Sequence, residues 1–275
     1  MDNKIESLSE INIVGATMCY SEGEQCKWSL DWLVENCDRV VVLMDNWDEK
    51  TNQIVLSYKE KYPEQVRVIY SKEPVGEKTN QIQGHAKRRF KLRQNWIREQ
   101  VIDELKKMNE EKKIDLLVWP DSDETFINQF PELLTEFWNN RPERWMMLGC
   151  VEPFENFKTI IHQTMACHGR IFKFDPSISA HPFCTRTRYW PYKDERAWKI
   201  RGVILHMCHF NQEYREKRQK CDNINWLEES QDKPVWLLPK DIRTMSIEEI
   251  ADYQPGQHQR PSKYKPITLR EYLNN

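Results

Sequence analysis

Four runs of apolar, largely β-branched residues recur along the first half of the chain. They are Ile11–Ala16, Arg39–Met44, Val66–Tyr70 and Ile114–Trp119. Nearly continuous apolar runs of this length are typical of strands in a sheet that is covered on both faces. The pattern therefore predicts four buried strands before residue 120.

Between these runs the apolar residues follow helical spacing. Helices are predicted from about Trp28 to Asn36, over Thr51–Tyr62 and over Phe90–Met108. Strands that alternate with helices indicate an α/β fold with a mainly parallel central sheet and helices on both faces. We predict one such domain, Rossmann-like in its first half.

The alternation weakens in the second half. A helix is predicted near Pro131–Trp138, and strands are predicted in "RWMMLGCV", "GRIFKF" and "GVILHMCHF". The stretch between the last two strands is rich in proline and aromatic residues, which indicates an irregular region. Residues 1–126 and 127–252 are expected to form two halves of the domain, and residues 253–275 an extended C-terminal tail.

Composition narrows the protein class. No stretch of the 275 residues approaches a membrane span, and the N-terminus carries no apolar signal-peptide core, so a cytoplasmic protein is expected. The eight cysteines form no C-x-x-C pair, which argues against a disulfide framework or a structural zinc site and favours buried reduced thiols. The net charge of -2 predicts no general affinity for nucleic acid or membranes.

The fourth predicted strand ends in "DSDE", where Asp121 and Asp123 lie two residues apart. In an extended segment this spacing points both carboxylates to one side, and two such charges repel unless solvent or a cation intervenes. Hard cations such as Mg²⁺ or Mn²⁺ prefer oxygen ligands and leave positions open for phosphate oxygens. The alternative interpretation is a pair of solvated turn acids.

The order "INIVGAT…SEGE", "VVVLMDNWDEKT", "RQN" and "DSDE" resembles glycosyltransferase family 2 and its relatives, with the A-type (GT-A) glycosyltransferase fold. The match covers about Ile11–Phe126. This chain has tryptophan where the family's second motif has serine, and "SEGE" lacks the family's asparagine before glutamate. The resemblance implies a donor that is a sugar nucleotide, with a UDP-sugar favoured.

The resemblance also implies roles in donor binding. Ala16 through Glu22 would edge the nucleotide, with Glu22 at the mouth of the pocket. Asp45 would accept a hydrogen bond from the base, and Arg93 and Asn95 would lie near the sugar or the phosphates. From the residues alone, Asp45 can equally be a turn or capping aspartate, and Arg93 a surface helix charge.

For the metal, the resemblance implies that Asp121 and Asp123 are the D-x-D pair, with Asp123 the more direct ligand of Mn²⁺ or Mg²⁺. It also implies that His206, which follows "VIL", completes the metal shell or touches the diphosphate, with His209 as the alternative. Both histidines can ligate one metal only if the strand ends between them. His181 is a weaker candidate.

An inverting transferase needs a carboxylate that accepts the proton of the acceptor hydroxyl. The candidates are Asp194 and Glu195 in "KDER", together with Glu155 and Glu152. Inversion is favoured over retention, and a solvated loop is the alternative interpretation of "KDER".

Two stretches, "GHAKRRFKLRQNW" and "TRTRYWPYKDERAWK", combine basic and aromatic residues. Such stretches can bind nucleic acid, so hydroxymethylated bases in DNA are a possible acceptor of the sugar. Aromatic side chains also stack on sugars, and near-neutral total charge favours a saccharide or glycolipid acceptor.

Two other function classes stay open. One is a nucleotidyltransferase, although "IVGATMCYSEGEQ" is poor in the glycines of a phosphate loop. The other is a non-catalytic module that binds nucleotide or sugar. The chain has no Walker loop, dinucleotide fingerprint or nucleophile elbow, which excludes the common nucleoside triphosphatases, dehydrogenases and hydrolases.

Overall fold

The computed structural model describes residues 4–20, 22–45, 48–72, 85–162, 167–178, 197–213, 215–216, 231–253 and 264–274. The chain divides into two compact units, and both are assembled from separate stretches of sequence. Unit 1 comprises Met1–Asp123, Pro131–Met147 and His168–Trp198; unit 2 comprises Glu124–Phe130, Leu148–Cys167 and Lys199–Asn275.

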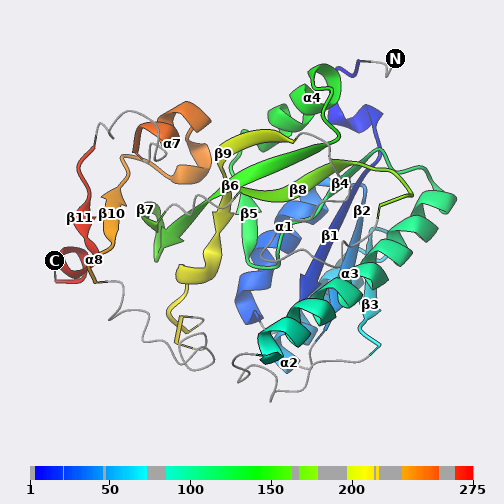
Figure 1. Cartoon of the computed structure of the whole chain (residues 1–275), viewed down its shortest axis with the longest axis horizontal. Coiled ribbons are helices and arrows are strands. Elements are labelled where there is room, and N and C mark those ends of the chain that lie inside the picture. The colour runs from blue at the N-terminus through cyan, green and yellow to red at the C-terminus, as the bar shows by residue number, and fades with distance from the viewer. Residues whose placement is uncertain are drawn as a thin grey trace. The chain divides into compact units, whose positions relative to one another are not determined.

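A mostly parallel sheet forms the centre of unit 1 (Figure 1). Its strands are β1 (Ile13–Cys19), β2 (Arg39–Met44), β3 (Val66–Tyr70), β4 (Leu116–Val118) and β8 (Cys167–Lys173), in the order β8-β4-β1-β2-β3. β1 is parallel to both β2 and β4, and β2 is parallel to β3, whereas β8 is antiparallel to β4. The mixed α/β fold with a mainly parallel sheet is therefore confirmed.

Helices connect these strands, as the sequence predicts. They are the short 3-10 helices η1 (Leu8–Glu10) and η2 (Gly23–Gln25) and the α-helices α1 (Cys26–Asn36), α2 (Glu49–Lys61), α3 (His85–Glu111) and α4 (Phe130–Asn140). Asp48 caps α2, because its Oδ2 accepts the main-chain N–H of Thr51 at 2.9 Å. α1 packs on β1 and α3 packs on β2.

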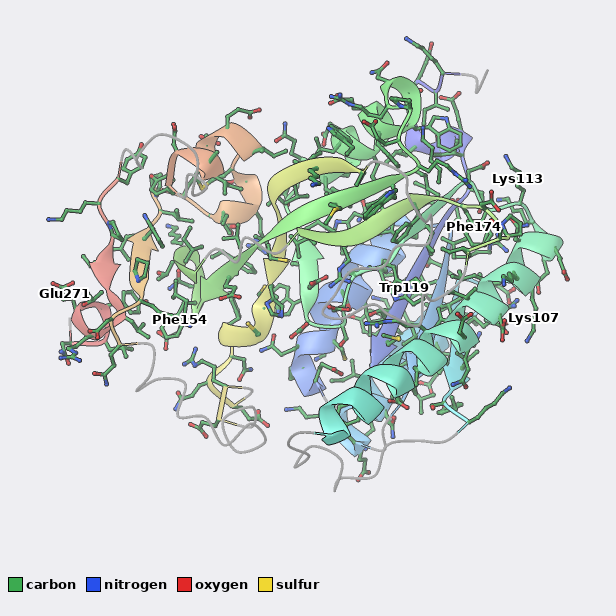
Figure 2. The ribbon with its side chains drawn as sticks, viewed as in Figure 1. Lys107, Lys113, Trp119, Phe154, Phe174 and Glu271 are labelled. Carbon is green, nitrogen blue, oxygen red and sulfur yellow. The ribbon has the colours of Figure 1, made fainter. Side chains whose placement is uncertain are left out.

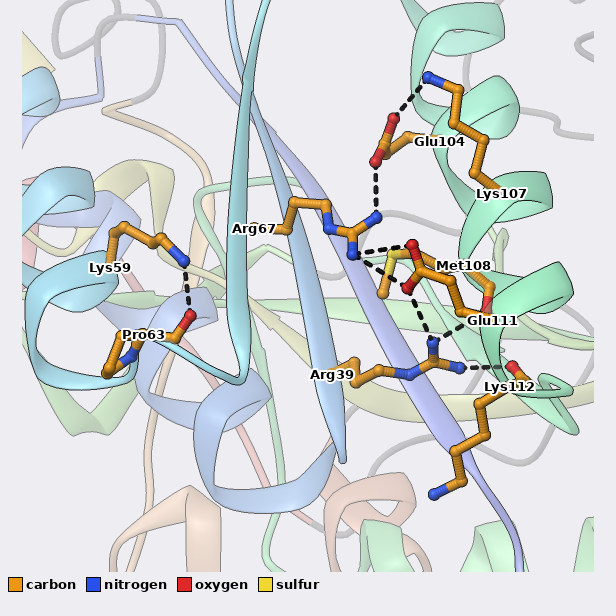
Figure 3. Close-up of polar contacts among 9 residues, drawn as sticks. All are labelled: Arg39, Lys59, Pro63, Arg67, Glu104, Lys107, Met108, Glu111 and Lys112. Atoms are coloured by element: carbon orange, nitrogen blue, oxygen red, sulfur yellow. Dashed lines mark hydrogen bonds and ion pairs between the residues drawn. The ribbon is translucent and has the colours of Figure 1, made fainter.

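Two arginines tie α3 to the sheet (Figure 3). Arg39 on β2 donates to the main-chain carbonyl oxygen of Met108 at 2.8 Å. Arg67 on β3 donates to Glu104 at 2.8 Å and to Glu111 at 3.0 Å. The two strands are thereby held, near their first residues, against successive turns of one helix.

Unit 2 is built mainly from antiparallel strands. They are β5 (Glu124–Phe126), β6 (Trp145–Phe154), β7 (Asn156–His162), β9 (Trp198–His206), β10 (Pro234–Leu237) and β11 (Ile267–Thr268). β6, β7, β10 and β11 follow one another in the sheet, and β9 pairs with both β5 and β6. The helical elements are η4 (Met207–His209), η5 (Ile242–Thr244), α7 (Ile247–Tyr253) and α8 (Leu269–Leu273).

The core of unit 2 includes the end of the chain. Phe154, labelled in Figure 2, packs in one buried cluster with Ile161, Val235 and Leu269. The ring of Tyr272 meets that of Phe154 edge-on, with the centroids 5.8 Å apart. The sequence predicts an extended tail here, but the described residues 264–274 form β11 and α8, because Leu269 has a buried position to fill.

Candidate functional site

The D-S-D segment follows Trp119 and Pro120 after the end of β4, and α1 contacts it. The hydroxyl of Ser29 on α1 donates to the main-chain oxygen of Ser122 at 3.0 Å. Trp119, labelled in Figure 2, donates its main-chain N–H to Arg170 at 2.7 Å. Ser122 and Asp123 are buried. A turn acid that is held and buried in this way differs from the solvated acid of the alternative interpretation.

Asp121 forms an ion pair with Arg170. Arg170 lies on β8, next to the residue that pairs with Val118 at the end of β4, and its side chain has 0% exposure. The sequence predicts two carboxylates that need an external cation. For Asp121 the protein itself supplies a positive charge, the guanidinium of Arg170.

Glu22 and Asp123 form a pair of carboxyl groups that influence each other. The pKa of Glu22 is raised to about 7, chiefly by burial and to a smaller extent by the negative charge of Asp123. Hydrogen bonds from the main chain of Tyr20 and from Ser122 act in the opposite direction. The Tyr20 N–H lies 2.7 Å from Glu22 Oε2. A proton or a bound cation would relieve this repulsion.

The segment that carries Glu22 is anchored to α2. Gly23 has a positive φ of 57° and donates its main-chain N–H to the hydroxyl of Thr51 at 2.8 Å. Thr51 is in turn held by the cap residue Asp48. This chain of contacts keeps Glu22 in place near the carboxyl end of β1.

The nucleotide-binding residues that the resemblance implies lie at different depths. Asp45 is buried directly after β2, and its main-chain N–H donates to Cys19 at the end of β1, at 2.9 Å. Ala16 lies inside β1, opposite Val41, and has no exposed surface. The end of β1 is therefore three residues beyond Ala16, and its last residues lie nearer to Asp45.

Several predicted site residues cannot be placed as side chains. Arg93 and Asn95 belong to α3, but their side chains lie outside the described part of the structure. Asp194, Glu195 and His181 lie outside the described residues altogether. Their predicted roles stay predictions.

Glu155 lies at the turn between β6 and β7, where it adopts a positive φ of 61°. Its Oε1 accepts a hydrogen bond from Arg215 at 3.0 Å, and its side chain is 41% exposed.

His206 is the last residue of β9, and η4 begins at the next residue. The strand therefore ends between His206 and His209, which is the condition under which both could ligate one metal; the side chain of His209 is not described. The imidazole Nδ1 of His206 lies 3.6 Å from Oε1 of Glu152 and 3.3 Å from Sγ of Cys208. The potential ligand atoms of these three residues lie within 4.8 Å of one another.

Sequence reasoning treated Glu152 as a base candidate and Cys208 as a buried thiol. The available signal was the short spacing of His206 and Cys208 in "LHMCH". The third member, Glu152, comes from β6, the strand that pairs with β9, so it is found only once the pairing of these strands is known.

No family model matches the sequence, and no curated protein sequence matches it either. Among solved structures, the fold is similar to the crystal structure of S. aureus TarS, with 13% identity over 72% of this chain and a TM-score of 0.42. The match spans only 37% of that TarS chain. The structure of S. aureus TarS 1-349 matches with 12% identity over 80% of this chain and 73% of that chain, also at 0.42.

A third match is S. aureus TarS 1-349 in complex with UDP-GlcNAc, at 14% identity and a TM-score of 0.35. It covers 54% of this chain and 38% of that chain. Likenesses at such scores decide nothing about the function of this chain. No helix in the described part of the chain is long and apolar enough to cross a membrane.

Proposed function

We propose that the chain is a metal-dependent glycosyltransferase that moves a sugar from a nucleotide-diphosphate donor, a UDP-sugar in the first instance, to a hydroxyl acceptor. The observation that carries the proposal is the pair of carboxyl groups, Glu22 and Asp123, at the carboxyl ends of β1 and β4, where Glu22 has its pKa raised to about 7. Ligands of open α/β sheets bind at the carboxyl ends of the strands.

In this proposal Asp123 is the principal metal ligand. Asp121 is paired with Arg170, so its charge is already compensated, and it would act by positioning the D-S-D turn or by touching the donor. Mn²⁺ or Mg²⁺ would supply charge neutralisation for the departing diphosphate. These carboxylates offer only oxygen atoms as metal ligands, which fits a hard cation.

The Asp45 carboxylate, which is buried at the end of β2, would accept a hydrogen bond from an N–H of the nucleobase. Arg93 and Asn95 would contact the sugar or the phosphates. In the transfer step the acceptor oxygen bonds to the anomeric carbon, the bond from that carbon to the diphosphate breaks, and the acceptor proton passes to a carboxylate. Asp194, Glu195 and Glu155 are the candidates for that base in an inverting reaction, and a saccharide or glycolipid is the proposed acceptor.

The test is thermal unfolding with UDP, GDP or CDP, each with Mn²⁺ and with a chelator. A nucleotide present at about 100 times its dissociation constant should stabilise the protein by about 2.7 kcal/mol. We expect the shift with UDP and Mn²⁺, its loss with the chelator, and its loss in Asp123→Asn. The matched control is Asp103→Asn, the same charge change at an exposed position of α3, which should keep the shift.

A metal-dependent shift that survives in Asp123→Asn would overturn the assignment of the metal ligand. If nucleotide binds but no UDP-sugar is turned over with any acceptor, the non-catalytic binding module becomes the better description. The acceptor panel should contain saccharides, glycolipids and hydroxymethylated DNA, so that transfer to DNA is an explicit outcome.

A further inference from the structure

The strand end that carries His206 brings three different ligand types to one point. Glu152 on β6, His206 at the end of β9 and Cys208 in η4 contribute an oxygen, a nitrogen and a sulfur. All three belong to unit 2.

Glu152 and Cys208 both approach the same ring nitrogen of His206. The contacts to Nδ1 are 3.6 Å from Glu152 Oε1 and 3.3 Å from Cys208 Sγ. A catalytic relay would use the two ring nitrogens separately, with one nitrogen for each partner. A single proton on Nδ1 can be donated to only one of the two neighbours, whereas a cation at the centre can bind all three atoms.

The distances fit a tetrahedral metal. Zinc bonds of about 2.0–2.1 Å to nitrogen, 2.0–2.2 Å to oxygen and 2.3 Å to sulfur place neighbouring ligand atoms about 3.4–3.6 Å apart when the angles are tetrahedral. The two contacts to Nδ1 lie within a few tenths of an ångström of these separations. The ligand atoms of the third pair, Glu152 and Cys208, lie within 4.8 Å of each other, and this pair would have to close to hold such an ion.

The chemistry of the ligands selects the metal. A thiolate and an imidazole favour a borderline-soft cation such as Zn²⁺ and disfavour Mg²⁺, which prefers oxygen ligands. The side chain of Glu152 is 7% exposed and Cys208 is 2% exposed, while the side chain of His206 is 25% exposed. Two ligands are thus shielded and one reaches partly into solvent.

We propose that Glu152, His206 and Cys208 bind Zn²⁺ with three protein ligands and a fourth position filled by water. Three protein ligands with an open position are the arrangement of reactive rather than structural zinc sites. In this arrangement His206 belongs to the zinc site through Nδ1, instead of completing the shell of the D-S-D metal. The zinc site does not depend on the proposed sugar transfer.

The test uses the full chain with its metal removed by chelation and then replaced by Co²⁺, which reports geometry through its absorption spectrum. We expect a single tightly held ion with the strong visible bands of four-coordinate Co²⁺ and a thiolate-to-cobalt charge-transfer band. Zn²⁺ should displace Co²⁺, and excess Mg²⁺ should leave the spectrum unchanged.

The decisive variant is Cys208→Ser, which is nearly equal in size and should abolish the charge-transfer band. Cys150→Ser is the matched control, since it removes a buried thiol from β6 outside the cluster and should keep the band. If Cys208→Ser fails to fold, Glu152→Gln provides the readout, because it keeps the shape of the side chain and should weaken Zn²⁺ binding at least tenfold.

Two results would overturn the proposal. One is a wild-type protein that binds no Zn²⁺ or shows only the weak spectrum of six-coordinate Co²⁺; the other is a charge-transfer band that persists in Cys208→Ser. Asp123→Asn separates this question from the proposed function, since it should lose the nucleotide shift and keep the cobalt spectrum. Each proposal can then fail without the other.

Discussion

Each unit of the molecule contains a cluster of ionisable side chains, and the two clusters differ in the atoms that they offer. In unit 1, Asp121, Asp123 and Glu22 contribute oxygen alone, and Arg170 compensates one of the charges. In unit 2, Glu152 is joined by the nitrogen of His206 and the sulfur of Cys208. In our two proposals the first set binds a hard cation and the second binds zinc.

The clusters also differ in how the fold assembles them. The carboxylates of unit 1 follow parallel strands, which bring their carboxyl ends to one edge of a sheet without further help. The cluster of unit 2 requires the pairing of β6 with β9 and a 3-10 turn that begins immediately after the strand. The first kind of site can be anticipated from strand order, whereas the second depends on register.

The largest loss of stability is expected when Arg170, which compensates the charge of Asp121 in unit 1, is replaced. Arg170→Met leaves Asp121 without the guanidinium, and breaking a buried ion pair typically costs about 3–5 kcal/mol. Asp121 is 34% exposed at its side chain, so we expect a loss near the lower end, about 3 kcal/mol in the free energy of unfolding. Urea unfolding of wild type and variant measures it.

The double variant Arg170→Met/Asp121→Asn is the control for this pair. It removes both charges and should recover at least about 1 kcal/mol of the loss, since no buried charge is then left uncompensated. If Arg170→Met lowers the free energy of unfolding by less than about 1 kcal/mol, the pair contributes no more than an ordinary surface ion pair. That result would contradict the role of Arg170 as a built-in counter-charge.

A smaller effect, dependent on pH, is expected from Glu22. Its pKa is about 7 in the folded protein, above the ordinary value of 4.5, chiefly because of burial. Between about pH 4.5 and 7 the folded state therefore keeps a proton that the unfolded state has released, so stability falls as pH rises and levels off above about 7. The full effect of this difference would be about 3.4 kcal/mol; because the Glu22 side chain is only half-buried, we expect a total fall of about 2 kcal/mol from this group.

Glu22→Gln should remove that part of the pH dependence and make the protein more stable than wild type above about pH 7. Urea unfolding of both proteins at about pH 5, 6 and 8 gives the comparison. If the free energy of unfolding changes equally with pH in the two proteins, Glu22 ionises normally. The main argument for a cation beside Asp123 would then be removed.

The strands of the central sheet were the most predictable part of the fold. Arg39–Met44 and Val66–Tyr70 have the predicted bounds, because each is a continuous β-branched run between polar turns. β1 extends beyond the predicted Ala16 to Cys19, since Thr17 and Met18 continue the pairing with β2 although they do not look like strand core. The local pattern overstates burial in β3, which is buried only at Val66 and exposes Tyr70, whereas β2 is buried almost throughout.

The parts that were not predicted depend on contacts between distant residues. β5 is three residues long, and its register with β9 pairs Glu124 with His206. The β6–β7 turn has Glu155 at a positive φ, where sequence reasoning expects glycine or asparagine. The pair of Asp121 with Arg170 joins residues 49 positions apart, which no spacing rule connects.

The smallest effect is expected at the exposed ion pairs that attach α3 to β3, which serve as the surface counterpart of the buried Arg170 pair. Arg67 is 39% exposed and contacts Glu111, which is 53% exposed, at 3.0 Å (Figure 3). Glu111→Gln should cost no more than about 1 kcal/mol, since exposed charges are well solvated in the unfolded chain and are screened by salt in the folded one. The loss should shrink further when unfolding is measured at high salt, whereas the cost of Arg170→Met should change little, because salt screens buried pairs much less.

Asp103→Asn on the same helix controls for a simple change of net charge. Equal salt sensitivity of the two losses would mean that Arg170 is as accessible to water as Arg67, and the contrast between a compensated buried carboxylate and a surface network would then be lost.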